Sequence, residues 1–412
     1  MSTFDWDAII VGAGAAGLMA AIRAAERGRR VLLLEKGKKA GVKILMSGGT
    51  RCNITHDCDS RGIIAAFGPN GKFLHSALAQ LGPRETVAFF EAEGVATKIE
   101  DTGKVFPVSD RAVDVLDALL RRLARSGATL SLFEPMRELH PQPEGGFRVV
   151  TPNRTVTAEK VLITTGGRSF PGCGTTGDGY GFAAAFGHTI LPQRPALVPL
   201  TVQPAWVGEL RGITLPDANL KVIAPDGKKL TSRRGSMLFA HFGLTGPAPL
   251  DVSRAVSGHP EPTTLTLEVD LLPNESEQAF DEFVQTATST QGKQLLAGVL
   301  STKIPRRVAD QVLVLCGLPV TRTAAALSRP DRLKLVGAVK RLRLPLRGTL
   351  GFEKAEVTAG GILLDEVDSR TMQSRKHAGL YFAGEVLDLD GWIGGYNFQS
   401  AWSTGWLAGR EL

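Results

Sequence analysis

The sequence predicts an α/β fold whose parallel sheet is interrupted along the chain by a β-rich and a helical insertion. Three observations predict it: a strand, glycine turn, helix and strand in the first 36 residues, a change of composition near residue 192, and a return to apolar runs and glycine loops near residue 350. The expected parts are an α/β part at 1–192, a β-rich domain at 193–273, a helical subdomain at 274–347 and a closing α/β part at 348–412.

The first 36 residues carry a specific pattern. An apolar strand ends at Val11, and the run Gly12–Gly17 has the spacing G-x-G-x-x-G. An alanine-rich stretch predicts a helix over residues 15–27, and a second apolar strand leads to Glu35. This order of elements, ending on an acid, predicts a dinucleotide-binding unit in which Glu35 accepts hydrogen bonds from a ribose.

Each glycine of this unit has a physical task. Gly12 allows the tight turn, Gly14 lets the backbone approach a pyrophosphate, and Gly17 lets helix and strand pack closely. The pyrophosphate is expected on the N–H groups of Ala15 and Ala16, where the helix dipole is positive. The unit by itself fits NAD as well as FAD.

A long loop after the second strand favours FAD. Residues 37–55 combine lysines, glycines, and amide or hydroxyl side chains, which are groups that hold phosphates and sugar hydroxyls. A protein that binds only NAD has little use for such a loop, whereas a protein that wraps an extended FAD needs one; a mobile surface loop is the alternative. The expected cofactor ligands in or beside this loop are Lys36, Lys43, Ser47, Gly48, Gly49, Arg51, Cys52 and Asn53.

Two later strands end in glycines that allow close approach to a dinucleotide. They are the apolar runs Lys160–Ile163 and Leu380–Ala383. A glycine-rich loop follows the second run, and a helix is predicted over 398–409 with Asn397 as its N-cap. The positive end of that helix can stabilise a reduced, anionic flavin ring. The expected cofactor ligands here are Gly166, Gly167, Gly384, Glu385, Gly395, Tyr396, Asn397 and Gln399.

Candidate catalytic residues come from three places in the chain. His241 stands among apolar neighbours in the β-rich insertion, where a satisfied core or turn residue is the alternative. Tyr180 follows a glycine-rich loop that we expect to cover a bound ring system, and Arg51 lies in the long loop after the second strand. We expect these three side chains near the reacting ring.

Composition bounds the class of protein. The 412 residues are 43% hydrophobic and 22% charged, as in globular proteins of two or three domains. No apolar run reaches the ~18 residues that span a bilayer, and the first residues are too short and too acidic for a signal peptide. The four cysteines lack metal-ligand or disulfide spacing, so we expect no metal site, no membrane partner and a cytoplasmic location.

The net charge of +7 is unevenly spread. Residues 303–347 hold eleven Lys or Arg against Asp310 and Asp331. Such a segment could attract nucleic acid. A solvated basic helical face is the preferred interpretation, because few aromatic residues interleave with the charges.

Together these motifs resemble the bacterial flavoprotein family of YhiN-like and BaiN-like oxidoreductases, which includes aminoacetone oxidases. The resemblance covers nearly the whole chain and implies FAD, a three-part architecture and an oxidoreductase, without naming a substrate. The motifs that carry it are Gly12–Gly17, Ser47–Asn53, Thr176–Tyr180, Phe242–Pro247, Gly384–Asp388 and Gly394–Gln399.

We therefore expect a glutathione-reductase-like FAD-binding Rossmann domain and an FAD-dependent oxidoreductase that transfers hydride through flavin N5. NAD(P)H is the expected electron donor, binding transiently, and the expected substrate is a small molecule. Two alternatives stay open: an oxygen-dependent amine oxidase, and a flavoprotein that binds or modifies RNA. The oligomeric state is left open.

Overall fold

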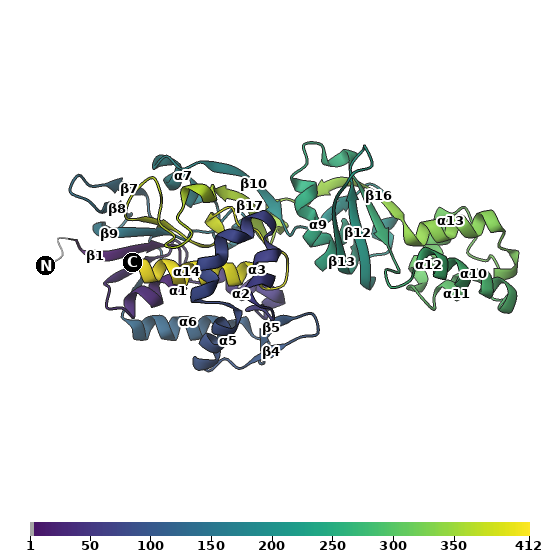
Figure 1. The fold of residues 1–412 in the computed structure, drawn as a ribbon, viewed down its shortest axis with the longest axis horizontal. Coiled ribbons are helices and arrows are strands. Elements are labelled where there is room, and N and C mark those ends of the chain that lie inside the picture. The colour runs from purple at the N-terminus through teal and green to yellow at the C-terminus, as the bar shows by residue number, and fades with distance from the viewer. Residues whose placement is uncertain (1–3) are drawn as a thin grey trace. The chain divides into compact units, whose positions relative to one another are not determined.

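The computed structural model describes residues 4–412, and the chain divides into two compact units. Unit 1 combines the residues up to Arg194 with Glu356–Leu412, and unit 2 is Pro195–Ala355. Figure 1 shows the elements of both units along the colour gradient of the chain. Each unit has its own hydrophobic core, so each can be described by itself.

The core of unit 1 is a sheet with the strand order β6-β2-β1-β9-β8-β7. Strand β18 pairs in parallel with the last residues of β9, and β8 pairs antiparallel with the first residues of β9. Every residue of β2 is buried, as expected for a parallel strand covered on both faces. The strands are β1 (Trp6–Val11), β2 (Val31–Leu34), β6 (Thr129–Ser131), β7 (Glu138–Pro141), β8 (Phe147–Val150), β9 (Thr155–Ile163) and β18 (Leu380–Phe382).

Two helices from opposite ends of the chain lie side by side on this sheet (Figure 1). They are α1 (Ala15–Ala25) and α14 (Tyr396–Glu411). A Cβ at Gly405 would lie 2.2 Å from the carbonyl oxygen of Ala16, and a Cβ at Gly409 would lie 2.4 Å from that of Ala20. The two backbones therefore touch over successive turns, which only glycine permits on the α14 side.

The other helices and short strands of unit 1 surround this centre. Helix α6 (Ala112–Ser126) has the spacing of apolar residues that predicts a helix, and it ends at Gly127, whose left-handed φ is +85°. Strand β10 (Ile190–Ala196) pairs with β17 (Val357–Ile362). The remaining elements are α2 (Val42–Thr50), β3 (Thr55–His56), α3 (Ser60–Ala66), α4 (His75–Gln80), α5 (Pro83–Ala92), β4 (Thr97–Ile99), β5 (Lys104–Pro107), α6 (Ala112–Ser126) and α7 (Asp178–Ala185).

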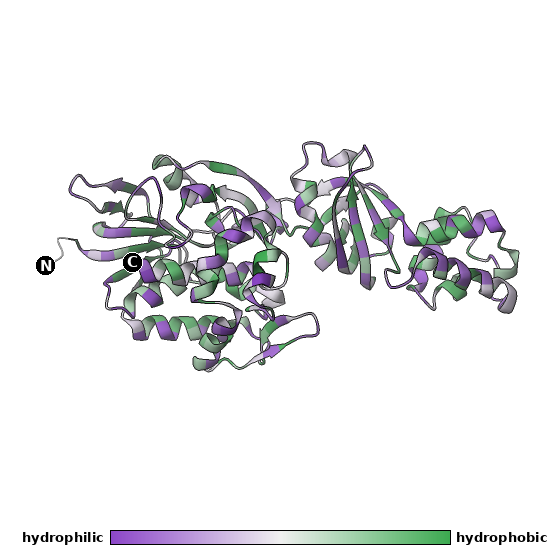
Figure 2. Ribbon diagram, viewed as in Figure 1, coloured by the Kyte–Doolittle hydropathy of each residue, from purple (hydrophilic) through white to green (hydrophobic). Residues whose placement is uncertain are grey.

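Unit 2 begins with a closed barrel of strand order β11-β14-β13-β12-β15-β16. Its strands alternate apolar and polar residues, visible as alternating colours in Figure 2. Residues 342–347 were expected in the helical subdomain and residues 348–349 in the closing α/β part. The segment Leu342–Thr349 instead forms β16, whose alternate leucines fill the barrel. The elements are β11 (Leu200–Val202), α8 (Trp206–Glu209), β12 (Thr214–Ile223), β13 (Lys229–Ala240), β14 (Gly243–Thr245), α9 (Pro247–Ser257), β15 (Thr266–Asp270) and β16.

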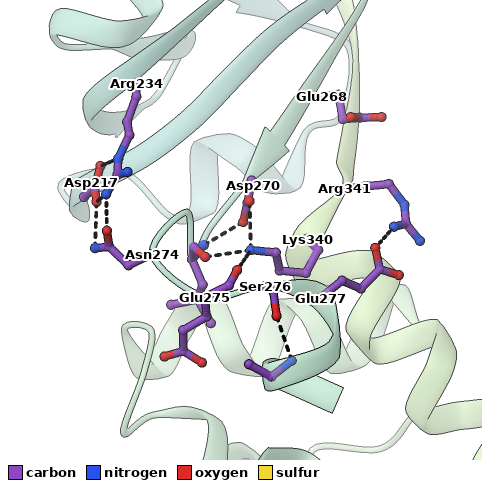
Figure 3. Close-up of polar contacts among 12 residues, drawn as sticks. Asp217, Arg234, Glu268, Asp270, Asn274, Glu275, Ser276, Glu277, Lys340 and Arg341 are labelled. Carbon is purple, nitrogen blue, oxygen red and sulfur yellow. Dashed lines mark hydrogen bonds and ion pairs between the residues drawn. The ribbon is translucent and has the colours of Figure 1, made fainter. Parts of the chain in front are cut away.

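A lobe of helices, here called the helical lobe (residues 276–340), completes unit 2. Lys340 fixes it to the barrel: its Nζ pairs with Asp270 at 2.8 Å and donates to the carbonyls of Leu272 and Glu275 at 2.6 and 2.5 Å (Figure 3). Ser276 caps the first helix by accepting from the N–H of Ala279. The helices are α10 (Glu277–Thr290), α11 (Leu296–Leu300), α12 (Arg306–Leu315) and α13 (Arg329–Lys340).

Within residues 4–412, every helix falls short of the length and apolar character needed to cross a membrane.

Candidate FAD site

The carboxyl ends of β1, β2, β9 and β18 meet at one edge of the unit 1 sheet, because these strands run parallel and in register. This edge gathers four segments that sequence reasoning selected separately: the glycine turn after β1, Glu35 after β2, Gly166 and Gly167 after β9, and Gly384 and Glu385 after β18. Ligands of open α/β sheets bind at such an edge.

Two glycines of the first turn are needed for packing. Gly12 has φ +103°, and a Cβ there would lie 2.7 Å from the carbonyl oxygen of Thr164. A Cβ at Gly17 would lie 1.9 Å from the carbonyl oxygen of Gly12. The hydroxyl of Thr164 donates to this same carbonyl at 2.8 Å, so β1, β9 and α1 are locked together here.

The middle glycine of the motif, Gly14, is not needed for packing. A Cβ at Gly14 would have no atom within 4 Å, so the space beside it is open. Gly14 is the N-cap of α1 and offers no side-chain cap. The first-turn N–H groups, including those of Ala15 and Ala16, therefore lack an intrahelical partner at the positive end of the helix. An open cradle of N–H donors fits a pyrophosphate.

Glu35 and Lys36 are already engaged with neighbouring backbone and loops. The carboxylate of Glu35 accepts from the N–H of Ala13 at 3.0 Å and from that of Gly37 at 2.7 Å. These bonds hold Glu35 beside the glycine turn and leave further acceptor positions for a ribose. The Nζ of Lys36 contacts Thr176 and Asp178 at 2.6 and 2.5 Å, so it fixes the loop before α7.

A polar network from four distant segments surrounds Glu385. One carboxylate oxygen pairs with Nζ of Lys43 at 2.6 Å, and the other accepts from the hydroxyl of Ser169 at 2.6 Å and the N–H of Thr358 at 2.9 Å. Lys43 also donates to Ser169 at 2.6 Å. Sequence reasoning found Lys43 and Glu385 but missed Ser169 and Thr358. Both are fully buried hydroxyl residues, and nothing in the chain links them to residue 385 until the fold brings them together.

The loop predicted over 37–55 is partly helical. Helix α2 runs to Thr50 but is broken at Ser47, Gly48 and Gly49, where the two glycines have φ of +56° and +67°. A Cβ at Gly49 would meet nothing within 4 Å, so backbone is exposed at this break. The prediction that Cys52 binds the cofactor is corrected: the side chain is fully buried, and burial raises the pKa of its thiol to about 12.

Arg51 is held by protein groups. Its Nη1 pairs with Glu100 at 2.6 Å and with Asp110 at 3.5 Å, and its guanidinium lies 4.0 Å from the ring centre of Phe106. The hydrogen bond that Arg51 donates to the carboxylate of Glu100 raises the pKa of Arg51. These contacts hold the side chain in place but leave it 37% exposed, so the expected catalytic or cofactor-binding role of Arg51 stays a prediction. Sequence reasoning missed both acids.

Helix α14 starts earlier than predicted. Its N-cap is Gly395, with φ +93°, and Asn397 lies inside the first turn. The side chain of Asn397 bonds to the N–H and carbonyl of Gly391 at 2.8 and 3.1 Å. With its amide oriented to satisfy both ends, Asn53 accepts from the N–H of Gly395 at 3.0 Å and donates to the carbonyl of Thr55 at 2.8 Å. Both asparagines thus shape the loop that leads into the helix.

The prediction that Gln399 binds the cofactor is corrected as well. Gln399 is fully buried, donates to the carbonyl of Leu81 and the hydroxyl of Thr86, and accepts from the hydroxyl of Thr55 at 2.6 Å. All its polar atoms are used inside the protein. Tyr396 stacks on the ring of His56 at 4.5 Å, and so forms one wall of this loop.

Tyr180 presents a buried phenol at the same end of the sheet. Its Oη and the hydroxyl of Thr165 are buried without a hydrogen-bond partner among residues 4–412. Burial raises the pKa of Tyr180, and the negative charge of Glu385 raises it further, so the phenol keeps its proton at neutral pH. His241 lies in unit 2 at the exposed turn between β13 and β14, which is the turn position named as the alternative to a catalytic role.

The open N–H cradle, the two orphan hydroxyls, the exposed break in α2 and the uncapped N-terminus of α14 suit an extended dinucleotide with a ring system. They define the class: a flavoprotein with a Rossmann-type FAD-binding domain. The family profile described as the HI0933-like protein Rossmann domain matches residues 6–411, so the chain belongs to this family of FAD-dependent oxidoreductases.

Curated relatives cover the whole chain. It is 36% identical over 410 residues to the ribosomal RNA dihydrouridine synthase of Escherichia coli (strain K12), covering 99% of this chain and 98% of that one. It is 32% identical over 409 residues to the 3-dehydro-bile acid delta(4,6)-reductase of Clostridium scindens, covering 97% of each.

A solved structure shares the fold. The 3-ketosteroid-delta4-(5alpha)-dehydrogenase of Rhodococcus jostii RHA1 aligns with a TM-score of 0.55 and 16% identity, covering 100% of this chain and 98% of that one. At this identity the likeness supports the FAD-binding Rossmann fold with its insertion, and nothing finer.

Proposed function

We propose that this protein reduces a carbon–carbon double bond conjugated to a carbonyl, with electrons from NAD(P)H, and that the substrate is a uridine of ribosomal RNA. The observation that carries the proposal is the full-length similarity to a ribosomal RNA dihydrouridine synthase. The reaction would be uridine plus NADPH plus a proton, giving 5,6-dihydrouridine and NADP⁺.

The two kinds of relative share one chemistry. Making dihydrouridine adds two hydrogens across C5=C6, which is conjugated to the C4 carbonyl. A delta(4,6)-reductase of a 3-dehydro-bile acid acts on double bonds conjugated to a 3-keto group. In each reduction, hydride would add to an electron-poor carbon of the conjugated system and a proton would complete the addition, so the same kind of flavin site would suit either substrate.

The chain's own residues would divide the work as follows. The N–H groups after Gly14 would bind the pyrophosphate, and Glu385, held by Lys43 and Ser169, would orient sugar or ribityl hydroxyls. The uncapped N-terminus of α14 would stabilise negative charge on the ring. When bound, FAD supplies hydride transfer between the nicotinamide and the substrate carbon.

A product assay tests the proposal. Purified protein loaded with FAD is incubated with NADPH and ribosomal RNA transcribed in vitro, and nucleosides are analysed by mass spectrometry. We expect one uridine site to gain two hydrogen atoms, and a Gly14→Val variant without flavin to give none. RNA unchanged by the FAD-loaded protein, with the flavin fully reduced by NADPH, would contradict the RNA substrate.

A small conjugated enone is the second candidate, since a full-length relative is named for such a substrate. NADPH oxidation that depends on a steroid dienone, with RNA inert, would favour it. Release of hydrogen peroxide with a small amine, and no reduction by NADPH, would favour the amine-oxidase alternative instead.

A further inference from the structure

Almost all of the net charge belongs to unit 2. Unit 2 holds twenty of the 48 Lys and Arg residues and fourteen of the 41 Asp and Glu residues, so it carries +6 of the total +7. A positive excess confined to one unit is the electrostatic footprint of a polyanionic partner. Only those cations of unit 2 that are not paired with a carboxylate are available to bind such a partner.

The basic segment 303–347 is largely neutralised by the fold. Six of its cations lie in ion pairs with carboxylates that come from other parts of unit 2 or from the same helix. These pairs are Lys303–Glu275, Arg306–Asp310, Arg332–Asp281, Lys340–Asp270, Arg341–Glu277 and Arg343–Glu268. Much of the helical face noted in the sequence is thus a salt-bridged surface.

The end of the helical lobe is different. Residues 287–294 and 319–330, here called the lobe tip, run side by side: Leu295 bridges to Thr323, and the N–H of Ala324 donates to the carbonyl of Gln294 at 2.9 Å. The chain has no acid from 283 to 309 or from 311 to 330. The fold therefore joins two acid-free segments into one surface.

Three cations stand on the lobe tip. Lys293 and Arg329 are exposed, and neither has an ion-pair partner among residues 4–412. Arg322 is half-buried, and its Nη1 donates to the carbonyl of Ala326 at 3.0 Å. Asp331, the next acid in the chain, is bound to the hydroxyl of Ser328 at 2.8 Å. The surrounding side chains are mostly threonine, serine, glutamine and alanine, and none is aromatic.

We infer that the lobe tip binds the phosphate backbone of RNA. Cations among hydroxyl and amide groups, with the Asp331 carboxylate bound to Ser328 at the edge, match phosphate oxygens. Because no aromatic side chain is present to stack on bases, the contact positions the RNA without reading its sequence. This inference rests on the RNA substrate proposed above, and it assigns that substrate's docking contact to Lys293, Arg322 and Arg329.

The test compares two variants of the FAD-loaded full chain that change charge equally. Lys293→Glu/Arg329→Glu alters the lobe tip, and Arg61→Glu/Arg148→Glu alters exposed arginines of unit 1. The probe is fluorescein-labelled ribosomal RNA transcribed in vitro, titrated at several salt concentrations. For the tip variant we expect Kd to rise about ten-fold and the slope of log Kd against log salt to fall by about 1.5 to 2. The control should change little.

The readouts separate this inference from the proposed function. Dihydrouridine formation with an unchanged Kd and KM in the tip variant would overturn the inference and leave the reductase standing. RNA binding that depends on the lobe tip, without formation of dihydrouridine, would support the docking contact and contradict the proposed reductase. Equal, tip-dependent binding of poly-L-glutamate would overturn RNA in favour of an acidic protein, and absence of RNA binding by the unaltered chain would overturn the inference too. NADPH reduction of the flavin and the milder Lys293→Gln/Arg329→Gln variant check that a loss of RNA binding is not caused by misfolding.

Discussion

At the scale of single residues, the glycines of the first turn fall into two kinds: those needed for packing and one that borders the space for a ligand. Gly12 and Gly17 have no room for a side chain, whereas Gly14 opens onto empty space. The same motif therefore contains two residues whose substitution should lower the stability of the fold and one whose substitution should weaken ligand binding. The distinction is testable because the two effects are measured differently.

Gly14→Ala should weaken FAD binding at least ten-fold and change the free energy of unfolding of the apoprotein by no more than about 0.5 kcal/mol. Gly17→Ala should destabilise the apoprotein by about 3 kcal/mol, since its Cβ would lie 1.9 Å from a carbonyl oxygen. Denaturant unfolding and FAD titration check both. An equal loss of stability in the two variants would contradict this division.

A second residue-scale feature is the carboxylate of Glu366. Burial alone would raise its pKa, but hydrogen bonds from Lys376 at 2.7 Å and from Thr189 outweigh burial and lower the pKa to about 2. A depressed carboxyl pKa contributes stability above the unfolded value, near 4.5, and that stability is lost as the pH falls toward 2.

Glu366→Gln should therefore reduce the free energy of unfolding by roughly 1–2 kcal/mol at pH 7, with an allowance for screening by solvent. The difference from the unaltered protein should shrink steadily between pH 4.5 and pH 2. Urea unfolding across this range measures it. A difference that stays constant with pH would argue against a native ion pair.

At the scale of elements, the contact of α1 with α14 holds the site together, because both helices start at the ligand edge. Gly405→Ala should force the helices apart, costing about 2–3 kcal/mol and weakening FAD binding. Gly298 in α11 is a matched control, since a Cβ there meets nothing within 4 Å. Gly298→Ala should be neutral or stabilising by up to about 1 kcal/mol. Thermal unfolding and flavin content are measured for both variants. Equal effects of Gly405→Ala and Gly298→Ala would contradict a role for the contact between the helices.

Besides a shared hydrophobic core, a buried lysine, Lys340, joins the barrel to the helical lobe (Figure 3). Lys340→Met would leave Asp270 and two carbonyls without their partner, and should destabilise unit 2 by about 3 kcal/mol. Arg341→Met removes a neighbouring exposed pair and should cost less than about 1 kcal/mol. Limited proteolysis of the lobe compares them; equal protection would contradict a structural role for Lys340.

Sequence patterns predicted helices and strands better than the ion-pair and hydrogen-bond partners of single side chains. The periodicity of α6 and the glycine after it were sufficient, since both are local signals. The start of α14 was misplaced because a left-handed Gly395 caps it where an asparagine was expected. The salt bridges of Arg51 and the burial of Gln399 depend on residues more than forty positions away, which no local pattern encodes. The same holds for Ser169 and Thr358 around Glu385.

At the scale of the whole molecule, two units divide the properties of the protein. Unit 1 holds the candidate FAD-binding edge, and unit 2, inserted between β10 and β17 in the sequence, holds most of the net positive charge. The family and its FAD-binding fold are established by the match over residues 6–411. The proposed reductase uses unit 1 for chemistry, and the proposed lobe tip gives unit 2 a contact for RNA.

In the proposed reaction, NADPH reduces the bound flavin, and uridine in ribosomal RNA takes up the electrons. The most direct measurement is an anaerobic titration that follows the visible flavin band. We predict that NADPH bleaches the band stoichiometrically and that unmodified ribosomal RNA restores it, with one dihydrouridine formed per flavin reoxidised. A band that NADPH does not bleach, or that only oxygen restores, would contradict the account.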